Sequence, residues 1–212
     1  MKNIELHATI EVQPKEIESK SFAIITELLG DIELDAMQAP IIKRVIHTSA
    51  DFDYAENLYF SEGVVQTLLQ AMQNGADIVT DTQMAKAGIN KTALAKFGGT
   101  VHCFMADEDV AVKAKERGIT RAMVSMEKAS QMAKPVIFAI GNAPTALIRL
   151  QELIAQGKMN PVAIIAVPVG FVNVVESKED IMKGPAPCIV AKGRKGGSNI
   201  AAAICNALLY ML

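Results

Sequence analysis

The hydrophobic positions of the chain change their spacing near residue 75. Beyond it, short runs rich in β-branched residues indicate buried strands at 77–80, 100–103, 136–140, 162–167 and 188–190. Helical patterns alternate with them at 84–96 (broken near Gly88), 107–117, 144–156, 174–182 and 199–211. Because the strand runs are almost continuously apolar, helices should cover both faces of the sheet. The alternation predicts an α/β fold, a doubly wound parallel sheet of about five strands in three α/β/α layers.

The first part of the chain has a helical period instead. Pro14 suits a helix start, and Gly30 can end the apolar stripe formed by Ile17, Ile24, Ile25, Leu28 and Leu29. A second helix should begin at Pro40, with Ile41, Ile42, Val45 and Ile46 inward, and a third should cover about 62–74. These helices must pack on the sheet or on a second subunit. Since no linker or repeat interrupts the pattern, residues 1–212 are expected to form a single domain.

Composition narrows the function classes. The chain has 212 residues, half of them hydrophobic, with a net charge of -2, 5% aromatic residues and no Trp. Neither global attraction to nucleic acid nor stacking of its bases is supported. The longest apolar stretches are shorter than the roughly 20 residues that span a bilayer, and the first residues lack a signal-peptide core. A cytoplasmic protein is therefore expected, with no nucleic-acid or membrane partner.

The residues that could ligate a metal are few and scattered. Cys103, Cys188 and Cys205 form no CxxC pair, and no two of His7, His47 and His102 have ligand spacing. Neither a disulfide framework nor a metal site is predicted. His102 lies in an apolar strand and is interpreted as a core or near-core histidine with a hydrogen-bond partner.

Three loops that should follow strands are chemically unusual. They cover 141–147, 168–177 and 191–199, and each combines small residues with the start of a helix. Helix N-termini attract anions, and parallel strands place such loops at one edge of the sheet. A ligand with several carboxylates is predicted there, because no GxxxxGK[ST] or GxGxxG phosphate motif follows a strand. The candidate binding residues are Asn142, Thr145, Gly170, Arg194, Lys195, Gly196 and Ser198. The alternative is that the glycines only permit turns and the basic residues are solvated.

His47 is the candidate for proton transfer. It should end the helix that begins at Pro40, with Lys43 and Arg44 one turn earlier on the same face. Histidine exchanges protons near neutral pH, and the polar segment 48–54 can orient the ring. The alternative is an ordinary imidazolium at a helix end. Ser21 is a quieter candidate: it shares a face with apolar residues, so its hydroxyl either bonds back to its own helix or points into a ligand cleft.

Several segments together resemble the precorrin-8X methylmutase family. They are Lys20-Ser-Phe-Ala-Ile-Ile25, Arg44-Val-Ile-His-Thr-Ser-Ala-Asp-Phe-Asp-Tyr-Ala55, Asp81-Thr-Gln-Met-Ala-Lys-Ala-Gly-Ile89, Gly141-Asn-Ala-Pro-Thr-Ala-Leu147, Val167-Pro-Val-Gly-Phe-Val172 with Glu176-Ser-Lys178, and Gly193-Arg-Lys-Gly-Gly-Ser198. They span almost the whole chain in order. One departure is Lys20, where the family often has Arg, which loses bidentate carboxylate binding.

The resemblance implies a flavodoxin-like sheet, a homodimer and an isomerase of cobalamin biosynthesis. Such an enzyme shifts a methyl group from carbon 11 to carbon 12 of a tetrapyrrole polycarboxylate. No cofactor is implied, since any cobalt would belong to the substrate. The family's proton-handling histidine falls on His47, its substrate-contacting serine on Ser21 and a basic substrate position on Arg121. Lys43, Arg44, Arg194, Lys195 and Arg121 are then expected to hold carboxylate arms.

Two other classes stay open at this point. One is a non-catalytic corrinoid or flavin carrier of the same fold, although the Asp-x-His-x-x-Gly signature of cobalamin carriers is absent. The other is a structural dimeric scaffold, which the high apolar content favours but which leaves the three loops unexplained.

Overall fold

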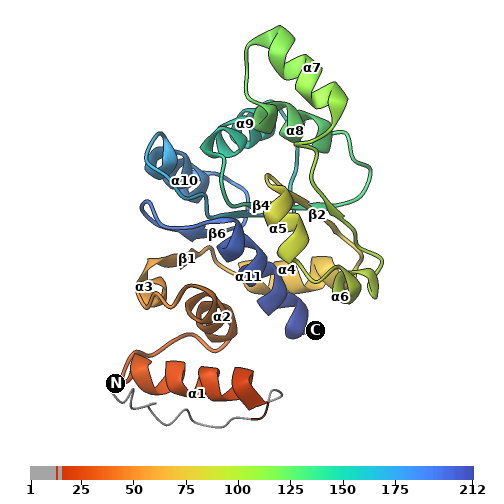
Figure 1. The fold of residues 1–212 in the computed structure, drawn as a ribbon. Coiled ribbons are helices and arrows are strands. Elements are labelled where there is room, and N and C mark those ends of the chain that lie inside the picture. The colour runs from red at the N-terminus through yellow and green to blue at the C-terminus, as the bar shows by residue number, and fades with distance from the viewer. Residues whose placement is uncertain (1–12, 14–15) are drawn as a thin grey trace, which may run out of the picture. The chain divides into compact units, whose positions relative to one another are not determined.

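A computed structural model gives the fold, and it describes Gln13 and residues 16–212. Pro14 and His7 lie outside the described residues. The chain divides into two compact units, Met1–Glu33 and Leu34–Leu212. In the first unit, α1 (Ile17–Leu29) forms where a helix was predicted, and its residues Ile25 and Leu29 are buried. Figure 1 shows the fold.

The second unit is built on a six-stranded sheet in the order β1-β6-β5-β4-β2-β3. The strands are β1 (Leu58–Phe60), β2 (Asp77–Thr80), β3 (Val101–His102), β4 (Val136–Ile140), β5 (Ala163–Ala166) and β6 (Cys188–Ala191). Strands β2 to β6 are parallel, in the order found in flavodoxin-like folds. The predicted sheet is confirmed, and β2 and β4 have the predicted bounds. Strand β1 was not predicted; it is antiparallel to β6, with Leu58 opposite Ala191.

Helices cover both faces of the sheet, so the three predicted layers are present (Figure 1). One layer contains α2 (Ala39–Ser49), α4 (Val64–Gln73), α5 (Gln83–Gly88), α6 (Lys91–Ala95) and α11 (Ser198–Tyr210). The other contains α8 (Arg121–Ala129), α9 (Pro144–Ala155) and α10 (Val174–Lys183), with α7 (Glu108–Arg117) packed on α8. The short helix α3 (Tyr54–Asn57) immediately precedes β1. The sequence pattern predicts these helices within a few residues, except α3 and α8.

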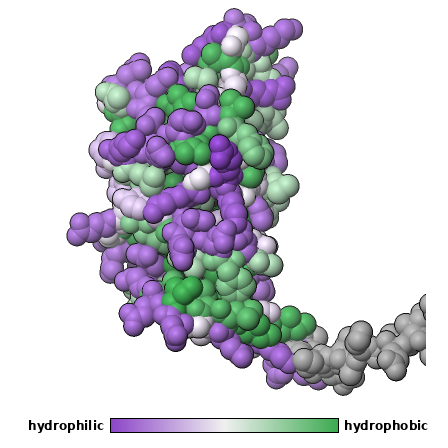
Figure 2. Space-filling model, turned by 90° about the vertical axis from the view of Figure 1, so that its left-hand side faces the viewer, coloured by the Kyte–Doolittle hydropathy of each residue, from purple (hydrophilic) through white to green (hydrophobic). Residues whose placement is uncertain are grey.

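Many of the hydrophobic residues are buried between the sheet and the helices that cover it. Side chains from β4 and β5, such as Phe138 and Ile164, pack with Leu147 and Leu150 of α9 and are fully buried. Hydrophilic residues dominate the face of the molecule that Figure 2 shows, with smaller hydrophobic groups between them. Among the described residues, no helix is long and apolar enough to cross a membrane.

Two predictions about cysteine and histidine can be compared directly with the structure. Cys103, Cys188 and Cys205 are buried free thiols, as expected. His102 fits the near-core interpretation: its side chain is about a third exposed, and its Nε2 lies 3.2 Å from Oδ2 of the buried Asp77. This contact joins the last residue of β3 to the first residue of β2.

Candidate functional site

The candidate site lies at the carboxyl edge of the parallel strands. The strand order reverses between β2 and β4, and ligands of open α/β sheets bind at such a switch point. Four segments leave the strands at this edge: 81–82 after β2, 141–143 after β4, 167–173 after β5 and 192–197 after β6. The three loops singled out in the sequence are therefore brought to one edge, as expected.

The first loop, 141–143, does not present free backbone donors. Oδ1 of Asp81 accepts the N–H of Gly141 at 2.8 Å, and Oδ2 accepts the N–H groups of Asn142 and Ala143 at 2.8 and 2.6 Å. Burial raises the pKa of the Asp81 carboxyl, and the three hydrogen bonds oppose that rise. The protein's own carboxylate thus occupies the position that the sequence suggested for a ligand, and only the exposed side chain of Asn142 faces outward.

Gly141 is required by packing. A Cβ on Gly141 would lie 2.7 Å from Cα of Ser198, the first residue of α11. At the same contact, Oγ of Ser198 lies 2.7 Å from Oγ1 of Thr82, which also accepts the N–H of Ala85. Ser198 is half-buried and holds α11 to the segment after β2.

Two main-chain hydrogen bonds join the third loop, 193–197, to the second loop. The N–H of Gly197 donates to Val167 O at 2.9 Å, and the N–H of Gly170 donates to Arg194 O at 3.2 Å. Gly196 has φ +155°, and a Cβ there would lie only 2.1 Å from Val167 O. Only glycine fits this position, because an added side chain would collide with the backbone of the second loop. Gly170 and Gly196 therefore join the two loops to each other.

Lys178 is a residue that sequence reasoning did not single out as part of the site. It lies on α10 and is only 1% exposed. Its Nζ donates to Gly193 O at 2.9 Å and to Lys195 O at 2.8 Å. Burial lowers the pKa of this amine to about 8. A signal was present in the sequence, since Val174, Lys178 and Ile181 have the spacing of a buried helix face.

This burial predicts a dependence of stability on pH. In the unfolded chain Lys178 has its ordinary pKa of 10.5, whereas in the folded chain the value is about 8. Between these values the unfolded state binds more protons, so the free energy of unfolding rises with pH, by up to about 3 kcal/mol across the window. Urea unfolding of the wild type and of Lys178→Met at pH 7 to 10.5 measures the effect. Parallel curves for the two proteins would contradict it.

His47 lies in the last turn of α2, as predicted, although the helix continues to Ser49. The residues Ile41, Ile42, Val45 and Ile46 are buried, and His47 is on the exposed side. The turn that follows is tied to the third loop, because Nζ of Lys195 lies 2.7 Å from Oδ2 of Asp51 and 2.5 Å from Oδ2 of Asp53. Hydrogen bonds to these carboxylates raise the pKa of Lys195, and the same contact lowers the pKa of Asp51.

The topology explains how the end of α2 reaches this edge. Because β1 is antiparallel to β6, its first residue lies opposite the last residue of β6. The N–H of Lys192 then donates to Asn57 O at 2.9 Å. The segment before β1, from Asp51 to Asn57, is thereby placed at the carboxyl edge of the sheet.

The predicted cations do not all converge. The guanidinium of Arg44 lies over the ring of Tyr210, 5.1 Å from its centroid, at the end of α11 opposite Ser198. Lys43 is half-buried on α2, whereas Arg194 is exposed in the third loop. Ser21 belongs to the first unit, where its Oγ donates to Ile17 O of the same helix at 2.8 Å. The back-bonding interpretation of Ser21 is thus the one observed.

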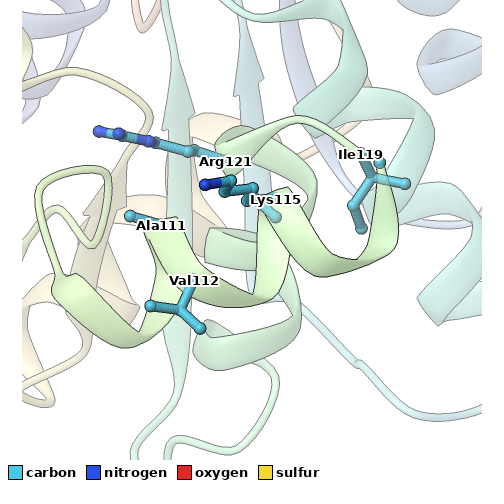
Figure 3. A pocket seen from close by; sticks show the side chains of 7 residues that line it. Ala111, Val112, Lys115, Ile119 and Arg121 are labelled. Atoms are coloured by element: carbon cyan, nitrogen blue, oxygen red, sulfur yellow. The ribbon is translucent and has the colours of Figure 1, made fainter.

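Arg121 begins α8, next to the start of α9. Thr120 caps α8 by accepting the N–H of Met123, and its Oγ1 donates to Oγ1 of Thr145 at 3.0 Å. Arg121 also lines an open pocket of about 470 Å³ between α7 and α8. Figure 3 shows the nitrogen ends of Lys115 and Arg121 pointing to the same side of this pocket. Thr145 and Arg121 are therefore near one another, on the side of the sheet opposite α2.

In the part of the chain that the structure describes, no group of three or more His, Cys, Asp or Glu side chains is placed to hold a metal ion. At the carboxyl edge lie the exposed guanidinium of Arg194 and the backbone loops, and the exposed imidazole of His47 lies four residues before Asp51, which Lys195 binds. Such a set can bind anionic groups and transfer a proton.

Comparisons with known proteins point the same way. A model of the precorrin-8X methylmutase family matches residues 16–211. The cobalt-precorrin-8 methylmutase of Priestia megaterium is 45% identical over 199 residues, covering 94% of this chain and 88% of that protein. That of Salmonella typhimurium is 45% identical over 206 residues, covering 94% and 96%. The crystal structure of a precorrin-8X methylmutase from Thermus thermophilus has a TM-score of 0.85 and 37% identity, covering 92% and 96%.

Proposed function

This chain belongs to the precorrin-8X methylmutase family, and from that premise we propose that it moves a methyl group from carbon 11 to carbon 12 of precorrin-8X or cobalt-precorrin-8. By homology it is a methylmutase, an isomerase of cobalamin biosynthesis. The product is hydrogenobyrinate or, with cobalt in the substrate, cobyrinate. His47 acts as the proton donor and acceptor.

The observation that carries the proposal is the reversal of the chain at β1. It delivers the segment after His47 to the carboxyl edge, where Lys195 binds Asp51 and Asp53. His47 is therefore four residues from a turn that is fastened to the third loop. An imidazole near a crevice is what a proton-assisted rearrangement needs, and no nucleophile or redox group is required.

The surroundings suit a ring that carries many carboxylates. Lys192 and Arg194 are exposed in the third loop. In the second loop Phe171 and Val172 are 84% and 77% exposed, which is unusual for large apolar side chains. Positive charge beside apolar surface matches a flat, conjugated macrocycle with acidic arms. Burying Phe171 alone against such a ring is worth about 2 kcal/mol.

The chemistry balances as an isomerisation. The bond from carbon 11 to the methyl group breaks, and the bond from carbon 12 to it forms. We propose that His47 gives a proton to the ring to favour the shift and takes a proton back as the product chromophore forms. Arg194 and Arg121 hold carboxylate arms, together with Lys43. Lys195 does not hold a carboxylate arm, since Asp51 and Asp53 already balance its charge. It joins the third loop to the turn after α2.

The direct test is to mix the purified protein with precorrin-8X, and separately with cobalt-precorrin-8, and to record the visible spectrum with time. Conversion to the product spectrum of either pair is expected. Binding without conversion would favour the alternative of a non-catalytic corrinoid-binding protein. The predicted homodimer and the single domain over 1–212 stay predictions, and sedimentation of the purified protein measures the first of them.

A further inference from the structure

Lys178 is a buried cation without a buried anion. Among the described residues, none of the ion pairs includes it, and its Nζ is occupied by two main-chain carbonyls. A buried ammonium is costly, and an apolar side chain of the same length would avoid that cost. Both acceptors belong to the 193–197 loop, so this charge affects the conformation of that loop.

The two hydrogen bonds also determine where the N–H groups of the loop point. The described chain has no cis peptide bonds, and in a trans peptide the C=O and the N–H point in opposite directions. Since the carbonyls of Gly193 and Lys195 face Lys178, the N–H groups of Arg194 and Gly196 face away from it. Neither N–H donates to an acceptor within the described chain.

The charge of Lys178 makes these two N–H groups better anion donors. An ammonium behind a carbonyl polarises the peptide and increases the positive character of its N–H. Main-chain N–H groups that have no acceptor within a loop can bind anions. The exposed side chain of Arg194 adds a full charge on the outer side.

We propose that Lys178 is a positioning residue, which shapes the 193–197 loop so that the N–H groups of Arg194 and Gly196 bind one carboxylate arm of the substrate. This inference rests on the proposed function. It adds a residue that acts through the main chain and does not touch the substrate. A positioning role of this kind affects binding of the ring more than the methyl shift itself.

The test compares Lys178→Met with Lys183→Met, since both lysines lie on α10 and Lys183 is exposed. Lys178→Met should raise the KM and the Kd for cobyrinate by about 10- to 100-fold, the worth of one or two charge-assisted hydrogen bonds. Its kcat should change by less than about threefold, because the reacting atoms are untouched. Lys183→Met should match the wild type, and Lys178→Arg should recover part of the lost affinity.

Two outcomes would overturn the inference. One is a folded Lys178→Met protein that binds cobyrinate like the wild type. The other is a loss in kcat with KM unchanged, which would place Lys178 in the chemical step. If Lys178→Met does not fold, Lys178→Gln, which has no charge, is measured in its place and should weaken binding to the same extent. Turnover by the wild type decides the proposed function separately, and the ratio of the Kd values decides the role of Lys178.

Discussion

Replacing His47 with alanine is expected to abolish turnover while leaving product binding nearly intact. General acid–base catalysis by one positioned histidine contributes roughly 100- to 10,000-fold to the rate, and the proposed mechanism assigns the proton transfer to His47 alone. Because His47 is exposed, its loss should change the free energy of unfolding by no more than about 0.5 kcal/mol. The rate is measured from the visible spectrum, and the Kd by titration with cobyrinate.

Thr92→Ala is the control, since Thr92 is also exposed and lies on α6, outside the proposed site. It should retain wild-type kcat. Full activity of His47→Ala would remove the histidine from the mechanism. Equal losses of binding and turnover would show that His47 holds the ring and does not transfer the proton.

Asp81→Asn is expected to give the largest loss of stability among single isosteric changes at the site. An asparagine side chain has one carbonyl oxygen, so in either orientation its NH₂ group faces at least one of the three N–H donors that Asp81 now accepts. Leaving buried donors unsatisfied costs about 3 kcal/mol here, which lowers Tm by roughly 6–12 °C in a chain of this size. The start of α9 should loosen with it.

The control for this change is Asp180→Asn, an exposed carboxylate on α10. Its Tm should stay within about 2 °C of the wild type. Thermal unfolding of both variants in the same buffer gives the comparison. An unchanged Tm for Asp81→Asn would mean that the carboxylate does not hold the 141–143 loop.

The central strands and long helices could be predicted because their patterns are local. Residues 136–140 are apolar throughout and bounded by Pro135 and Gly141, so strand β4 could be placed to the residue. Helix α8 was missed because its buried face is made largely of Ala and Ser, with Val124 and Met126 as the only large members. Strand β1 has three residues and no alternation, and it exists because β6 pairs with it.

The convergence of the three loops at one edge was predicted, whereas the residues that support these loops were missed. Loop composition was enough to bring Gly170, Gly196 and Ser198 to one edge. The role of Asp81 depends on contacts across about 60 residues of sequence, which no local pattern contains. Lys178 has the spacing of the buried face of α10, but an isolated lysine on a helix is normally solvated, so the spacing alone did not single it out.

The short pairing of β1 with β6 has a consequence for heat sensitivity. A rim strand with three residue pairs opens locally at a lower free energy than the central strands of the same sheet. Such fraying would swing the end of α2 outward while the parallel strands stay folded. We therefore expect the protein to stop turning over its substrate on warming before it unfolds as a whole, with hydrogen exchange at 58–60 rising first.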